Sequence, residues 1–279
     1  MVVISFGKKG YIIIGKRIKF LKINVKKSKY VYSDEVFTKT EPSNTSEAYK
    51  LCVRADALRF ANMYKESISS YLQAIMLDRN NADCYYGIGI SYKFLSNYEK
   101  ALEYLEKAKE LAPDRFEISF ETGVTYMLMG IPCQAIKHFI DAIMIDKENT
   151  DAQLHLAMAH ELADEEDLAL LIYDRVIECF PFCLNAYNHK AALLMSLGHF
   201  KEAAETFKQV IKLNKDYYKA YYGLGICFDR LNNTRSAQIY YRKFVNLKPH
   251  SKDAEFARHR INQLKNQLNL KQRAKLKVV

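Results

Sequence analysis

Small and large apolar residues return at a fixed interval of 34 along most of the chain. Six rows of that length align without insertion or deletion, and they cover residues 48–81, 82–115, 116–149, 150–183, 184–217 and 218–251. The eighth position of every row is small: Ala55, Gly89, Gly123, Ala157, Ala191 and Gly225. The twentieth position is also small: Ser67, Ala101, Ala135, Ala169, Ala203 and Ala237. An internal period of this kind predicts an array of similar units, each packing on its neighbours.

Each row predicts two antiparallel helices, because the small residues at positions eight and twenty let two helices approach closely. Position twenty-four supplies a large side chain beside them: Tyr71, Leu105, Phe139, Tyr173, Phe207 and Tyr241. Proline at position thirty-two of alternate rows ends the second helix, where its missing N–H does least harm: Pro113, Pro181 and Pro249. The chain contains 10 Gly and 5 Pro, a low usage that favours helices over a turn-rich β fold.

This pattern resembles the tetratricopeptide-repeat (TPR) family over residues 48–251. The resemblance implies an all-α fold, a right-handed superhelical solenoid of helix-turn-helix repeats. It also implies a concave groove lined by the first helix of each repeat, in which TPR domains generally hold peptides or helices of partner proteins. The expected function is therefore a protein–protein interaction scaffold or adaptor, such as an assembly or co-chaperone-like factor.

The ends of a repeat array need capping, since a terminal repeat would otherwise expose an apolar face. Residues 45–251 form the expected repeat domain, and residues 252–270 carry apolar residues at helical spacing that predict a capping helix. Residues 271–279 are expected to form a basic tail. Residues 1–44 form a basic extension, in which Val2–Phe6 and Tyr11–Ile14 flank a Gly-Lys-Lys-Gly turn. That extension is predicted to be either disordered or a short hairpin.

The formal net charge of +10 belongs to the ends of the chain. Residues 48–251 hold 24 basic and 26 acidic side chains, so the array itself is close to neutral. This distribution argues against a specific nucleic-acid binder. It leaves an alternative function open: a membrane-surface or RNA-associated protein that uses its basic tails, with peripheral membrane contact through the N-terminal segment.

Family analogy places the groove at positions two, five, six, nine, twelve and thirteen of each first helix. Positions five, nine and thirteen are mostly apolar; position thirteen, for example, holds Phe60, Phe94, Leu128 and Leu162 in the first four rows. The candidate groove residues are Asp56, Phe60, Tyr86, Gly87, Ile90, Phe94, Phe120, Glu121, Val124, Leu154, His155, Met158, His189, Tyr222, Gly223 and Ile226. Rows three and four are net acidic, so the expected partner is a peptide or amphipathic helix that is basic and apolar. Packing between neighbouring repeats is an alternative explanation for part of this apolar set.

Position six of the rows is unusual. Gly87 and Gly223 lie there inside a helix, where each glycine costs about 1 kcal/mol relative to alanine. One interpretation is that they open gaps in the groove floor for a ligand; the other is that they are neutral. Glu121, His155 and His189 hold the same position in successive rows, and ligands so distributed are expected to lie too far apart for one metal ion.

No sequence feature predicts an enzyme. The chain lacks a phosphate loop, a nucleophile elbow, paired carboxylates and a metal motif, so no catalytic residue, cofactor or metal is expected. The six cysteines form no CxxC pair and are expected to be free thiols in a cytoplasmic protein. The N-terminal apolar run is short and has no small-residue cleavage site, so no signal peptide is expected.

Overall fold

The computed structural model describes residues 2–6, 9–14, 17–21 and 44–276, and it divides the chain into the units Met1–Pro42 and Ser43–Val279. In the first unit, strands β1 (Val2–Phe6), β2 (Lys9–Ile14) and β3 (Arg17–Leu21) form an antiparallel sheet in the order β1-β2-β3. Ile4 pairs with Tyr11 and Tyr11 pairs with Phe20. The rest of the predicted basic extension, from residue 22 to residue 43, lies outside the described residues.

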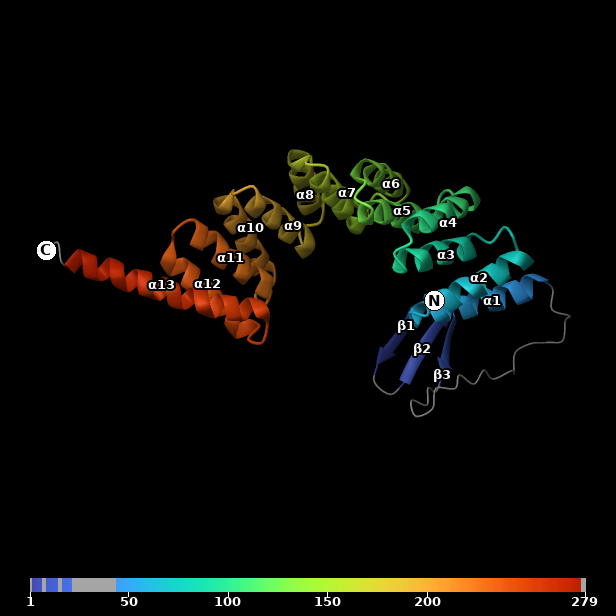
Figure 1. Cartoon of the computed structure of the whole chain (residues 1–279), viewed down its shortest axis with the longest axis horizontal. Helices are drawn as coiled ribbons and strands as arrows, with labels where there is room; N and C mark the ends of the chain where they lie inside the picture. The colour runs from blue at the N-terminus through green and yellow to red at the C-terminus, as the bar shows by residue number, and fades with distance from the viewer. Residues whose placement is uncertain (1, 7–8, 15–16, 22–43, 277–279) are drawn as a thin grey trace. The chain divides into compact units, whose positions relative to one another are not determined.

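The second unit is an all-α array of helix-turn-helix repeats, as the sequence predicts (Figure 1). The helices are α1 (Asn44–Phe60), α2 (Tyr64–Leu77), α3 (Ala82–Phe94), α4 (Tyr98–Leu111), α5 (Phe116–Leu128), α6 (Pro132–Ile145), α7 (Thr150–Leu162), α8 (Glu166–Cys179), α9 (Leu184–Ser196), α10 (Phe200–Leu213), α11 (Tyr218–Arg230), α12 (Thr234–Leu247) and α13 (Lys252–Leu276). The odd-numbered helices from α1 to α11 are the first helices of repeats 1–6, and the even-numbered helices are the second helices. Helix α3 and the later first helices begin at the first residue of their rows. Helix α13 runs past the predicted end of the capping helix at residue 270.

Each helix pair closes around the small residues that the repeat pattern singles out. Ala55, Ala157 and Ala191 at position eight are fully buried. A Cβ atom on Gly225 would lie 2.5 Å from Cδ1 of the Tyr241 ring, and one on Gly123 would lie 2.7 Å from Cε1 of the Phe139 ring. The large side chain at position twenty-four therefore occupies the space that the small residue at position eight leaves free.

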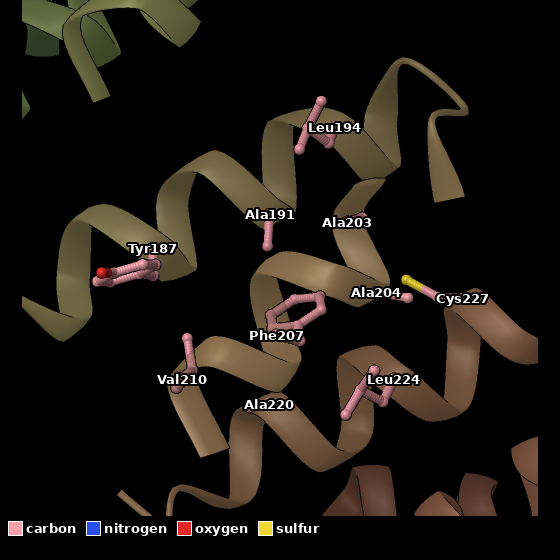
Figure 2. Close-up of a cluster of buried hydrophobic side chains, with 10 residues drawn as sticks. All are labelled: Tyr187, Ala191, Leu194, Ala203, Ala204, Phe207, Val210, Ala220, Leu224 and Cys227. Atoms are coloured by element: carbon pink, nitrogen blue, oxygen red, sulfur yellow. The ribbon is translucent and has the colours of Figure 1, made fainter. Parts of the chain in front are cut away.

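Neighbouring pairs share a core, which Figure 2 shows for repeats 5 and 6. Helix α10 contributes Phe207, which lies between α9 and α11. The surrounding buried side chains are Tyr187, Ala191, Leu194, Ala203, Ala204, Val210, Ala220, Leu224 and Cys227. Helix α13 continues this packing beyond repeat 6, because Ala254, Ala257 and Leu264 are buried against Tyr241 and Phe244. It therefore caps the array in the way the sequence predicts.

The turn inside every repeat uses a left-handed backbone at position fifteen. The residues there have φ between 56° and 80°, and they are Asn62, Ser96, Gly130, Asp164, Gly198 and Asn232. Glycine, asparagine and aspartate tolerate this conformation better than other residues. Ser96 is the residue of this set least suited to it.

We expect Ser96→Gly to raise the free energy of unfolding by about 0.5–1 kcal/mol, because glycine adopts this backbone without strain. The measurement is urea denaturation followed by circular dichroism. Gly130→Ala at the same position of repeat 3 is the reverse substitution and should lower the free energy of unfolding. A Cβ atom there would have nothing within 4 Å, so the loss of stability would come from backbone strain alone. A loss of stability in Ser96→Gly would contradict this explanation.

The prediction that all cysteines are free is wrong for one pair. Cys52 of α1 and Cys84 of α3 form a disulfide, with their Cα atoms 6.2 Å apart. Cys52 is position five of repeat 1 and Cys84 is position three of repeat 2, and the first helices of these two repeats are in contact. The spacing of the two cysteines in the sequence fits no known motif, so nothing in the sequence indicated the bond. Among the described residues, Cys133, Cys179, Cys183 and Cys227 are free, and burial raises the pKa of the Cys227 thiol to about 12.

Candidate partner-binding groove

Most first helices of neighbouring repeats contact one another directly. Helix α1 touches α3, α3 touches α5, α5 touches α7, and α9 touches α11. Side chains at equal positions of these helices therefore form rows that cross from repeat to repeat. The residues predicted for the groove lie on this set of helices.

The structure divides the predicted groove residues into three groups. Phe60 and Phe94 are exposed, whereas Gly87, Ile90, Leu154 and Gly223 are buried and do not form part of the surface. The half-buried remainder consists of Asp56, Tyr86, Phe120, Glu121, Val124, His155, Met158, His189, Tyr222 and Ile226. These four positions belong to the packed interior of the array and not to the groove surface.

Position thirteen carries an exposed apolar side chain in each of the first four first helices. Phe60 is 61% exposed, Phe94 57%, Leu128 53% and Leu162 46%. We call these four residues the position-thirteen stripe. It ends after repeat 4, because the same position holds Ser196 in repeat 5 and Arg230 in repeat 6.

Basic side chains lie over the two phenylalanines of this stripe. The Arg59 guanidinium is 4.7 Å from the centre of the Phe60 ring, and the Lys93 ammonium is 5.4 Å from that of Phe94. Tyr64 stacks on Phe94 with ring centres 5.0 Å apart. These contacts hold the two rings in place without burying them.

Ion pairs between repeats neutralise part of the charge near this surface. Lys93 pairs with Glu121, and Arg115 pairs with Asp83. The first pair joins α3 to α5, and the second joins α3 to the residue just before α5. In contrast, Asp151 at the start of α7 is exposed and forms no ion pair with any residue of the described part of the chain.

The interpretation that the two glycines at position six open gaps in the groove floor is wrong. A Cβ atom on Gly87 would lie 2.6 Å from Tyr71 Cε2, and one on Gly223 would lie 2.9 Å from Phe207 Cδ2. Both rings come from position twenty-four of the preceding repeat, so the missing side chains make room for a neighbour's ring. The alignment of rows compares equal positions and does not show which positions of consecutive repeats touch, so it could not reveal this contact.

The histidines at position six pack on the same neighbouring position. His155 lies 5.6 Å from the Phe139 ring centre, and His189 stacks on Tyr173 at 5.9 Å. Burial lowers the pKa of His189, so burial favours its neutral form. Within residues 47–269, whose side chains the structure describes, no group of His, Cys, Asp or Glu is arranged to hold a metal ion.

Sequence reasoning missed a set of tyrosine–carboxylate pairs in repeats 1, 4 and 6. Where position twenty-four is tyrosine, its hydroxyl donates to an acid of the first helix of the same repeat. Tyr71 donates to Asp56 at 2.6 Å, Tyr173 donates to Glu161, and Tyr241 lies 3.5 Å from Asp229. Burial raises the pKa of all three tyrosines. The signal was present in the sequence: the three rows with tyrosine at position twenty-four carry an acid at position nine or twelve.

Helix pairs of equal length, stacked in chain order with their first helices side by side, define an α-helical solenoid repeat protein. Models of the family described as tetratricopeptide repeat match residues 51–81, 82–115 and 190–252. The chain is a tetratricopeptide-repeat protein.

Similar proteins share this architecture at low sequence identity. Anaphase-promoting complex subunit 3 of Schizosaccharomyces pombe is 21% identical over 239 residues, which are 85% of this chain and 36% of that protein. The chain thus spans about a third of that relative's length. The crystal structure of PilW, a type IV pilus biogenesis factor, matches 75% of this chain and 97% of its own with 19% identity and a TM-score of 0.62. YrrB, a TPR protein with an unusual peptide-binding site, matches 68% of this chain and 97% of its own with 22% identity and a TM-score of 0.52.

No helix among the described residues has the length and apolar composition needed to cross a membrane.

Proposed function

We propose that this chain is an interaction scaffold or adaptor that binds an apolar segment of a partner protein along the first helices of repeats 1–4. The observation that carries the proposal is the position-thirteen stripe, whose four apolar side chains are all about half exposed or more. An exposed apolar patch with a polar surround is typical of a protein-binding surface. About half of each side chain is already covered, so burying the rest would contribute about 1 kcal/mol per residue.

The spacing of the stripe favours a helical partner. Helices in contact lie about 8–10 Å apart, so successive stripe residues are separated by about that distance. Residues seven apart on one face of a helix lie about 10.5 Å apart. Residues on one face of an extended strand lie about 6.6–6.8 Å apart, which matches less well. An amphipathic helix with apolar residues seven apart therefore fits the stripe best.

The similar proteins support binding as the general role. YrrB is described as having a peptide-binding site, and the S. pombe relative is a subunit of a complex. TPR proteins in general mediate protein–protein interactions.

We expect Phe94→Asp combined with Leu128→Asp to lower capture of the partner from an extract of the source organism by about tenfold or more, since an aspartate cannot replace a buried apolar contact. Captured proteins are quantified by mass spectrometry. The matched control is Met76→Asp on α2, which replaces a side chain 80% exposed on a second helix. Circular dichroism checks that each variant is folded.

Equal capture by the stripe variant and the wild type would contradict the proposal. If capture instead depended on residues 1–41 and fell steeply with salt, the basic ends would be the primary contact, as in the membrane-surface or RNA-associated alternative.

A further inference from the structure

We propose that Glu161 and Tyr173 form a binding site for an arginine side chain of the partner. This inference rests on the proposed function, because it places the arginine on the segment that the first helices bind. It names one contact of that segment, in the acidic repeat 4. It rests on a comparison of three equivalent sites within this chain.

Two of the three tyrosine–carboxylate pairs already hold a guanidinium group. In repeat 1, Arg59 donates from Nε to the Tyr71 hydroxyl at 3.2 Å and from Nη2 to Asp56 Oδ1 at 3.0 Å. In repeat 6, Arg260 binds Asp229 with two parallel hydrogen bonds, 2.6 Å from Nε and 2.8 Å from Nη2. The chain therefore uses a tyrosine–carboxylate pair as a guanidinium site twice.

The third pair has no such partner. Glu161 accepts a hydrogen bond from Tyr173 and forms no ion pair with any residue from Glu47 to Asn269, where the structure describes side chains. Tyr173 is fully buried, and Glu161 is half-buried at position twelve, the same position as Asp229. Burial raises the pKa of Glu161, as expected for a carboxylate without a nearby cation.

The repeat register explains why the cation is missing. Arg260 reaches Asp229 from position nine of α13, the helix that follows repeat 6. Position nine of α9, the helix that follows repeat 4, holds Ala192, which is small and exposed. Position nine of the following helix therefore supplies a guanidinium to Asp229 and no charged group to Glu161.

The chemistry of the pair favours arginine over lysine. A planar guanidinium can donate two parallel hydrogen bonds to a carboxylate, whereas an ammonium acts as a point charge. Arg260 with Asp229 shows this fork geometry in the chain itself. Leu162 of the stripe follows Glu161 directly and is exposed. On the partner segment, the arginine that binds Glu161 would therefore lie beside the apolar residue that contacts Leu162.

The test uses two fluorescein-labelled amphipathic helical peptides with leucines seven residues apart. One carries a single arginine, and the other carries citrulline, which has a similar shape and no charge. Binding to the full chain is measured by fluorescence anisotropy. We expect the arginine peptide to bind the wild type about tenfold or more tightly than the citrulline peptide, since a charge-assisted hydrogen bond to a half-buried carboxylate contributes at least that factor.

Three variants identify the site. Glu161→Gln should abolish the preference for arginine. Ala192→Arg should also abolish it, because the introduced guanidinium would reach Glu161 as Arg260 reaches Asp229. Ala192→Gln, which adds bulk without charge, should retain the preference.

Equal binding of the two peptides to the wild type would overturn the arginine site, and so would a preference that survives in Glu161→Gln. In either case the groove itself stands if Phe94→Asp with Leu128→Asp weakens both peptides. If neither peptide binds the wild type, both the arginine site and the helical mode of binding fail.

Discussion

Replacing Phe207 with alanine is expected to lower the free energy of unfolding by about 3–5 kcal/mol, the largest effect of any substitution considered for this chain. The ring is buried between α9 and α11 and contacts residues of both helices (Figure 2). Its loss removes apolar contacts from repeats 5 and 6 at once and leaves a cavity. Urea denaturation followed by circular dichroism measures the change.

The matched control is Phe182→Ala, because Phe182 is 84% exposed in the turn between α8 and α9. It should change the free energy of unfolding by less than about 0.5 kcal/mol. A double-mutant cycle with Gly223→Ala tests the packing directly. Gly223→Ala should be costly in the wild type, where its Cβ meets the Phe207 ring, and cost less or stabilise once that ring is gone. Additive effects would mean that the two positions do not touch.

Gly87→Ala is expected to lower the free energy of unfolding by about 1–3 kcal/mol, although alanine is the better helix former by about 1 kcal/mol. The added Cβ would meet the Tyr71 ring, 2.5 Å from its hydroxyl oxygen. That ring cannot move away easily, because it is buried and its hydroxyl is bound to Asp56 and Arg59. Steric overlap therefore outweighs helix propensity.

Tyr71→Leu provides the background in which this cost should shrink. Repeat 2 already has leucine at the equivalent position, Leu105, and the row after it carries Glu121 instead of glycine at position six. A Gly87→Ala variant as stable as the wild type or more so would show that the glycine is a neutral choice. Thermal and urea unfolding of the four proteins in the cycle give the answer.

The sequence predicted the all-α TPR fold because its signal is periodic and local. Small residues at positions eight and twenty determine how two helices of one row pack, and both lie in the same row. The groove was harder to predict, because its floor depends on contacts between rows. Gly87 next to Tyr71 and the disulfide between Cys52 and Cys84 both join consecutive repeats, and an alignment of rows one above the other does not show such neighbours.

The tyrosine–carboxylate pairs illustrate the same difference. Tyr173 and Glu161 lie in one row, so their pairing could have been read from the sequence. The importance of Ala192 could not be predicted from the sequence. It follows from the structure, in which Arg260 at the same position of the helix after repeat 6 binds Asp229.

Position twenty-four of one repeat packs on position six of the next, so the packing at each junction depends on the order of the repeats. Tyr71 and Phe207 require glycine in the next row, Phe139 and Tyr173 pack on histidine, and Tyr241 lies in one buried cluster with Ala257 of α13. A chimera that places repeat 3 directly after repeat 1 would bring the Glu121 side chain against the Tyr71 ring, a pairing that none of the six junctions between residues 48 and 257 uses. The units look alike in length and fold, yet they are not interchangeable modules, and shuffling them would disrupt the junctions while leaving each helix pair intact.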